Sequence, residues 1–97
     1  MPNYIILMKL TDQGAKTIKD APARVESGIK AFEKMGGKVI GFYVVMGEYD
    51  YVAVGEAPSD EVATTFALAL GSLGNVRTTT LRAHTKEEFA AMVKKLP

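Results

Sequence analysis

The stretch that decides the fold is VIGFYVVM-GEYD-YVAV, residues 39–54. Two runs rich in β-branched and aromatic residues flank a short segment that carries Gly47 and Asp50, and this pattern is typical of a β-hairpin. Gly47 can adopt a positive φ at no steric cost, and the Asp50 carboxylate can accept hydrogen bonds from nearby turn amides. We therefore expect strands over residues 38–46 and 51–56, joined by this turn.

The sequence before the hairpin predicts a strand and then a helix. Residues 4–10 (YIILMKL) are apolar at nearly every position, which is typical of a strand covered on both faces. Asp20 can cap a helix that has Pro22 in its first turn, where a missing N–H costs little. Apolar residues then recur at helical spacing until the glycines at 36–37 end the helix.

The sequence after the hairpin predicts a second helix, a fourth strand and a third helix. Ser59 is a good N-cap for a helix over residues 60–72, whose apolar stripe is unusually wide. Residues 75–83, rich in threonine, suit a strand. Thr85 and Glu88 stand three apart, as in the capping box that opens a helix.

The order β-α-β-β-α-β-α predicts an α+β fold. The first six elements match the ferredoxin-like βαββαβ unit, an antiparallel four-stranded sheet with both main helices on one face, and the last helix is an addition. A chain of 97 residues suits one domain, residues 1–97.

Both faces of the predicted sheet are apolar. In the first strand Ile6 and Met8 point one way and Ile5 and Leu7 the other, whereas a face exposed to water should carry polar residues. The last helix and a second copy of the sheet can each cover the second face, and we expect both to contribute. The sequence therefore predicts a homodimer or a higher homo-oligomer.

Composition excludes several classes of function. The net charge is +1, so no electrostatic attraction to nucleic acid or to an anionic membrane is expected. The chain has no cysteine, and it lacks the basic segment and long apolar core of a signal peptide. We expect a cytoplasmic protein without a cofactor and without a metal site.

A few side chains could bind or react with a ligand. His84 is the only histidine; it could act as a general base or a haem ligand, but packing on Phe89 at the helix start is the preferred interpretation. Tyr49 and Asp50 could orient a ligand at a subunit edge, although turn geometry alone explains both. Tyr43 could line a cavity.

Arg77 and Arg82 lie on opposite faces of one predicted strand. One of them therefore needs a carboxylate partner, such as Asp50 or a glutamate, unless it captures a substrate carboxylate. The candidate ligand-binding residues are thus Tyr43, Tyr49, Asp50, Arg77 and His84.

Three segments resemble the GYD domain family, namely residues 46–52 (MGEYDYV), 18–24 (IKDAPAR) and 70–83 (LGSLGNVRTTTLRA). The resemblance implies the dimeric α/β-barrel superfamily, in which two ferredoxin-like sheets pack face to face. Residues 47–51 and 74–80 are also similar to the effector-binding domain of leucine-responsive feast/famine regulators, which implies oligomers that bind amino acids between subunits. The same superfamily includes monooxygenases and haem-degrading enzymes.

The expected function is a homo-oligomeric, non-catalytic protein that binds a small organic acid or an amino acid. One alternative is a cofactor-independent monooxygenase or isomerase with an apolar pocket that contains His84 or two tyrosines. The other alternative is a purely structural subunit of a larger assembly.

Overall fold

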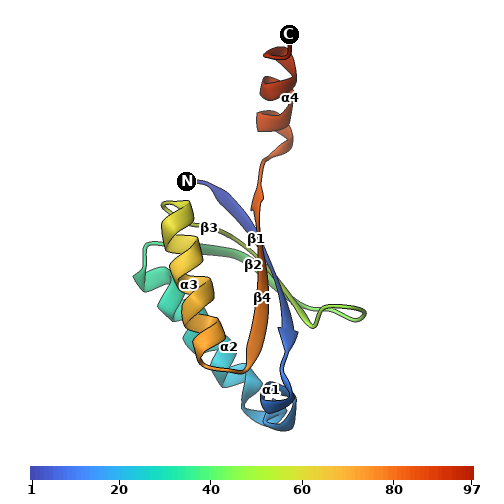
Figure 1. Cartoon of the computed structure of the whole chain (residues 1–97). Coiled ribbons are helices and arrows are strands. Elements are labelled where there is room, and N and C mark those ends of the chain that lie inside the picture. Colours follow the sequence, from blue (N-terminus) through green and yellow to red (C-terminus); the bar gives the residue numbers. More distant parts are fainter.

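The computed structural model describes all 97 residues of the chain (Figure 1). Its elements follow the order expected for a ferredoxin-like unit with an added C-terminal helix. The strands are β1 (Asn3–Leu10), β2 (Lys38–Val44), β3 (Tyr51–Glu56) and β4 (Val76–Ala83), and the helices are α1 (Asp12–Lys16), the short 3-10 helix η1 (Ile18–Asp20), α2 (Ala21–Lys34), α3 (Asp60–Ser72) and α4 (Lys86–Lys94). None of these helices combines the length and the apolar character that crossing a membrane requires.

The four strands form one antiparallel sheet in the spatial order β2-β3-β1-β4. β1 is one of the two inner strands, so Ile6 lies opposite Ala53 of β3 on one side and opposite Thr80 of β4 on the other. Figure 1 shows α2 and α3 together on one face of this sheet. The predicted ferredoxin-like α+β fold is confirmed.

The core lies between the sheet and helices α2 and α3. Tyr4, Ile6 and Met8, which alternate along β1, point into it and are buried. Phe32 of α2 and Phe66 of α3 meet above them with ring centroids 4.8 Å apart. Full burial of such an apolar side chain stabilises a fold by about 1.5–3 kcal/mol, so the buried side chains of β1 contribute to the packing of α2 and α3 on the sheet.

Local signals set the ends of the two main helices. The Ser59 hydroxyl accepts a hydrogen bond from the Val62 amide and caps α3 as predicted. Pro22 lies in the first turn of α2, although the side chain of Asp20 makes no capping hydrogen bond. After α2, Gly36 has a φ of 92°, a conformation that favours glycine.

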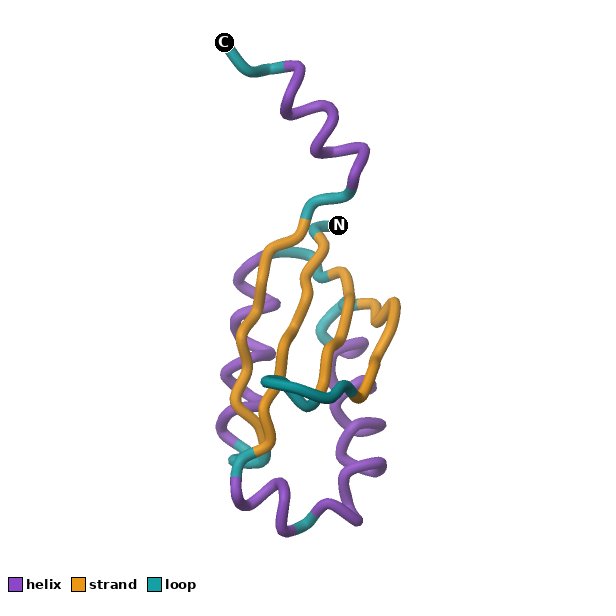
Figure 2. The backbone as a smooth tube through the Cα atoms, turned by 90° about the vertical axis from the view of Figure 1, so that its right-hand side faces the viewer, coloured by secondary structure: helices purple, strands orange, loops and turns teal.

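The connection between β2 and β3 is longer than the sequence suggests. β2 ends at Val44 rather than Met46, and its register shifts between Val39 and Gly41, where one extra residue is left unpaired. Residues 45–50 stand out from the side of the sheet opposite to α2 and α3 (Figures 1 and 2). Gly47 takes a φ of 109° there, as the hairpin pattern predicts.

Helix α4 extends away from the rest of the chain beyond the end of β4 (Figures 1 and 2). The predicted capping box between Thr85 and Glu88 is present, yet no residue of α4 is buried and Phe89 is 63% exposed. Both His84 and Phe89 are therefore open to solvent. The expectation that α4 covers the sheet of its own chain is wrong, because β4 directs the helix past the end of the sheet.

Candidate functional site

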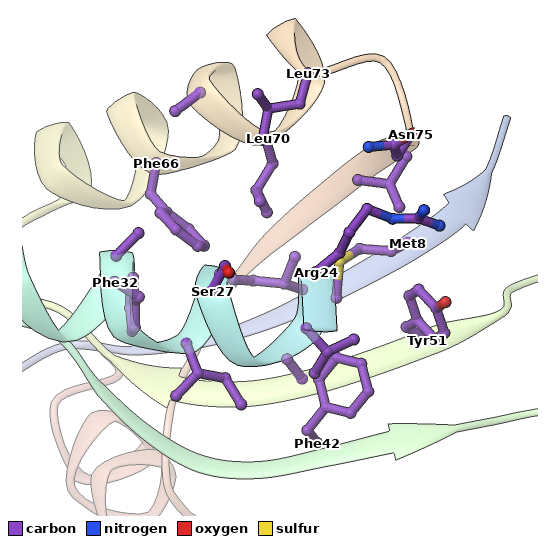
Figure 3. Close-up of a pocket in the computed structure, with 18 of the residues that line it drawn as sticks. Met8, Arg24, Ser27, Phe32, Phe42, Tyr51, Phe66, Leu70, Leu73 and Asn75 are labelled. Carbon is purple, nitrogen blue, oxygen red and sulfur yellow. The ribbon is translucent and has the colours of Figure 1, made fainter. Parts of the chain in front are cut away.

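A cavity of about 800 Å³ lies between α2, α3 and the sheet (Figure 3). This volume is within the range of about 300–1,000 Å³ that is usual for small-molecule sites. Of the 27 residues that line it, 20 are hydrophobic, including Met8 on the floor and Leu70 on the wall. The chain therefore offers space for an apolar molecule on the face of the sheet that the helices cover.

A glycine of α2 lines the cavity where this helix faces α3. Phe32 and Phe66 close one end of the space. One turn before Phe32 along α2 is Gly28, where a β-carbon would meet only Leu70, at 3.9 Å. Because Gly28 itself contributes no side chain, Leu70 is the only group that a β-carbon at this position would contact, and the space beside Leu70 stays open.

Polar groups gather at the other end of the cavity. Arg24 of α2, Tyr51 of β3 and Asn75 before β4 lie away from the pair Phe32 and Phe66 in Figure 3. An apolar body with one polar end is the usual composition of a small-molecule site, because the polar groups fix the orientation of the ligand.

Arg24 is half-buried and is held by neutral oxygens. One terminal nitrogen, Nη1, donates to the carbonyl of Thr17 at 3.0 Å and to its hydroxyl at 2.9 Å, and Nη2 donates to the carbonyl of Gly14 at 3.1 Å. These bonds fix the guanidinium against α1 but leave its positive charge without a carboxylate partner.

The second feature is the face of the sheet that no helix covers. We call it the open face. Its apolar part consists of Ile5, Leu7, Tyr43, Val52, Val54 and Leu81, which the strand register places side by side, and Thr79 of β4 and the pair Lys9 and Arg77 lie on the same face. Tyr43 is 61% and Leu81 45% exposed, and the other apolar side chains are half-buried. The apolar second face predicted from the sequence is therefore present and uncovered within one chain.

The 45–50 connection forms a rim at one end of the open face. Lys9, near the end of β1, contacts it twice: Nζ lies 3.4 Å from the Glu48 carboxylate and 5.3 Å from the centre of the Tyr49 ring. Asp50 accepts a hydrogen bond from the backbone amide of Leu10 at 2.8 Å. The expectation that Asp50 bonds to amides of its own turn needs this correction, because its carboxylate reaches the neighbouring strand.

A polar cluster joins β1, α3 and β4 at the opposite end of the sheet. The Tyr4 hydroxyl donates to the Asp60 carboxylate at 2.5 Å, and Arg82 pairs with the same oxygen at 3.2 Å. Burial raises the pKa of the Tyr4 phenol, and the Asp60 carboxylate raises it further, whereas Arg82 lowers it. One of the two predicted strand arginines thus has a carboxylate partner, but that partner is Asp60 rather than Asp50.

The residues predicted to bind a ligand do not form one site. Tyr49 and Asp50 lie on the rim, Arg77 stands opposite Lys9 in the sheet and donates to the Gly71 carbonyl, and Tyr43 belongs to the open face. His84 is exposed beyond β4. None of the five lines the cavity, and the structure brings together no group of three or more side chains that could hold a metal ion.

Sequence reasoning did not identify Arg24 or the residues that line the cavity, although the enzymatic alternative included an apolar pocket. The signals that could have indicated them are Gly28, which interrupts the apolar stripe of α2, and the wide apolar stripe of α3 around Leu70. Both features are also compatible with ordinary core packing, so only the relative position of the two helices shows that a cavity separates them.

The element order and the sheet topology define a ferredoxin-like α+β domain. The chain belongs to the GYD domain family, whose sequence pattern matches residues 4–93. Over 95 residues it is 37% identical to a protein of Thermus thermophilus named glutamine synthetase and cystathionine beta-lyase binding protein. The match spans 97% of this chain and 100% of that relative.

Solved structures share the fold. FFRP-DM1 superposes with a TM-score of 0.57 at 21% identity over 87% of this chain and 100% of that one. TTHA0845 from Thermus thermophilus has a TM-score of 0.57 at 25% identity over 88% and 95% of the two chains. PHS023 from Pyrococcus horikoshii has a TM-score of 0.56 at 20% identity over 89% and 93%.

Proposed function

We propose that this protein is a non-catalytic binding protein that works as a homo-oligomer paired through the open face. The observation that carries the proposal is the row of apolar side chains on that face, which includes Leu7, Tyr43 and Val52. An apolar patch that spans all strands of a sheet and has no cover is unusual for a monomer and favours association. A second copy offers the same patch, and twofold pairing is the simplest way to bury both.

Helix α4 supports the same proposal. Its apolar side chains are unpartnered within the chain, and it extends beyond the end of the sheet, so it can reach a neighbouring copy but not its own open face. We propose that α4 lies against the paired copy and adds to the interface. In this arrangement α4 still covers an apolar surface, as expected, but that surface belongs to the paired copy and not to its own chain.

The relative from Thermus thermophilus supports an enzyme as a further partner. That protein is named for binding glutamine synthetase and cystathionine beta-lyase, and this chain matches its whole length. We propose that this protein likewise binds an enzyme of amino-acid metabolism and acts in the cytoplasm. Purified glutamine synthetase and cystathionine beta-lyase from the same organism, immobilised in turn, should each be tested for saturable binding of the chain; binding by neither would contradict this part of the proposal.

The cavity supports small-molecule binding as a second function, in line with the expected small organic acid or amino acid. It favours binding over the enzymatic alternative, which required His84 or two tyrosines in the pocket. Tyr51 is the only tyrosine in the lining, and His84 lies outside it. The remaining polar groups, such as Arg24 and Asn75, suit the orientation of a ligand better than proton transfer near neutral pH.

Light scattering at micromolar concentration tests self-association. The wild-type chain is compared with a variant that carries a charge on the open face. Val52→Glu should weaken association by at least about tenfold, because pairing would bury an unpaired carboxylate. Leu68→Glu is the matched control, since Leu68 is 70% exposed on α3 and lies outside the open face. A wild-type chain that is monomeric, or a Val52→Glu variant that associates as well as Leu68→Glu, would overturn the proposal.

A further inference from the structure

We infer that the cavity between α2 and α3 binds a small-molecule carboxylate with an extended apolar body, and that Arg24 holds the carboxylate. This inference rests on the small-molecule binding proposed above and names the chemical class of the ligand.

The shape and lining of the cavity determine the body of the ligand. The space runs from the closed end at Phe32 and Phe66 to the polar end at Arg24, with Met8 and Leu70 between them (Figure 3). A chain or ring system laid along this path removes apolar surface of both ligand and protein from water, which is the main source of affinity in such sites. A polar body would lose its hydration without finding partners along most of the path.

The charge of Arg24 determines the head group. The ion pairs of the chain join Lys9 to Glu48 and Arg82 to Asp60, so Arg24 has no carboxylate within the 4.0 Å of a salt bridge. Its contacts to neutral oxygens leave further N–H donors on the guanidinium. The planar fork of these donors matches a carboxylate, and a half-buried position strengthens the attraction relative to water.

The charges in the cavity lining narrow the chemical class of the ligand further. Asp20 is the only acidic side chain there, and it is exposed, so water screens its charge. With Arg24 as the one cation, the lining can neutralise a single negative charge but not a polyphosphate. An amino acid would bring an ammonium group whose only carboxylate partner in the lining is the exposed Asp20, so a simple carboxylate fits better than the amino acid that the family resemblance suggests.

The probe is a series of straight-chain carboxylates from hexanoate to dodecanoate, titrated into the full chain below their micelle-forming concentrations. Binding is followed by calorimetry and by NMR shifts of the Met8 and Leu70 methyl groups. We expect saturable binding of at least one member, and about tenfold weaker binding of the alcohol and the amine of the same chain length, because a charge-assisted hydrogen bond is lost. Leucine should bind at least tenfold more weakly than the best carboxylate.

Two variants test the location of the site. Gly28→Leu places a side chain in the cavity and should weaken the best carboxylate at least tenfold, while the helix becomes no less stable because leucine is a better helix former. Gly71→Leu is the matched control, because Gly71 also lies in a helix, outside the cavity, and a β-carbon there meets nothing. Arg24→Gln should make the carboxylate and the alcohol bind equally.

Several results would overturn the inference. These are no saturable binding across the series, equal binding of carboxylate and alcohol by the wild-type chain, or unchanged binding by Gly28→Leu. Light scattering on the same samples separates the two proposals: a dimer that binds no carboxylate contradicts only the ligand class, whereas a monomer that binds one contradicts only the pairing through the open face.

Discussion

The carboxylate of Asp50 accepts a hydrogen bond of 2.8 Å from the backbone amide of Leu10, which is 40 residues away in the sequence. The amide of Asp50 also donates to the carbonyl of Met8 at 2.9 Å. Through these two bonds the end of the β2–β3 connection is attached to the end of β1. Both bonds extend the pairing of β1 with β3 beyond its last residue pair, Met8 and Tyr51. The rim of the open face is thus fixed to the inner strand β1.

Loss of this carboxylate should destabilise the domain. Asp50→Ala leaves the partly buried Leu10 amide without an acceptor, which costs about 1–3 kcal/mol of unfolding free energy. Glu48→Ala is the matched change on the same rim; it removes only a surface ion pair to Lys9 and should cost about 0–1 kcal/mol. Urea unfolding measures both, and equal losses would contradict the role assigned to Asp50.

Gly47 should resist substitution for a purely conformational reason. Its φ is 109°, and a β-carbon there would meet nothing within 4 Å, so Gly47→Ala costs about 1–2 kcal/mol through the backbone alone. Gly71→Ala is the matched change at a helical glycine with equally open surroundings, and it should stabilise the fold by about 0.5–1 kcal/mol. Thermal unfolding should therefore shift in opposite directions for the two variants; a shift in the same direction would count against this interpretation.

The buried phenol of Tyr4 should lose its proton at a higher pH than an exposed tyrosine does. Burial and the neighbouring Asp60 carboxylate raise its pKa, so the stabilisation linked to the neutral phenol is complete below the ordinary tyrosine pKa of about 10 and is lost as the pH rises through the raised value. The near-ultraviolet tyrosinate signal of the wild type should contain a late component that Tyr4→Phe lacks. Identical alkaline titrations of the two proteins, apart from total amplitude, would contradict the assignment.

The first turn of α4 should lose helical structure at acidic pH. The Thr85 amide donates to the Glu88 carboxylate and lowers the pKa of that carboxyl, so the capping box is complete above the ordinary glutamate pKa of about 4.3 and is lost as the pH falls through the lowered value. NMR shifts of residues 86–94 should report this loss of helix. Glu88→Ala should remove most of the pH dependence, whereas Glu87→Ala, the neighbouring exposed acid, should retain it.

Most of the fold was predictable because local signals determine its elements. Ser59 caps α3, Gly47 allows the hairpin turn, and Thr85 with Glu88 opens α4, each through contacts within a few residues. The nearly continuous apolar sequence of β1 also predicted that the second face of the sheet carries apolar side chains, and the structure places Ile5 and Leu7 there.

The cavity and the direction of α4 were not predictable in the same way. The cavity depends on how far Gly28 of α2 stands from Leu70 of α3, and this distance is set by packing between segments far apart in the sequence. The direction of α4 depends on where β4 ends, because no residue of the helix is buried against the domain. Arg24 was not predictable as a site residue for a related reason, because its role depends on the cavity beside it.

The accessibility of methyl groups on the open face tests the proposed pairing most directly. A soluble paramagnetic agent should broaden the methyl signals of Leu68 and Leu73, which are exposed on the helical side, at every protein concentration. If the open face is paired, the methyl signals of Leu7 and Val52 should be as protected as those of the buried Ile6 at high concentration and should become accessible on dilution. Leu7 and Val52 methyl groups that remain accessible at every concentration would contradict the pairing and, with it, the proposed homo-oligomer.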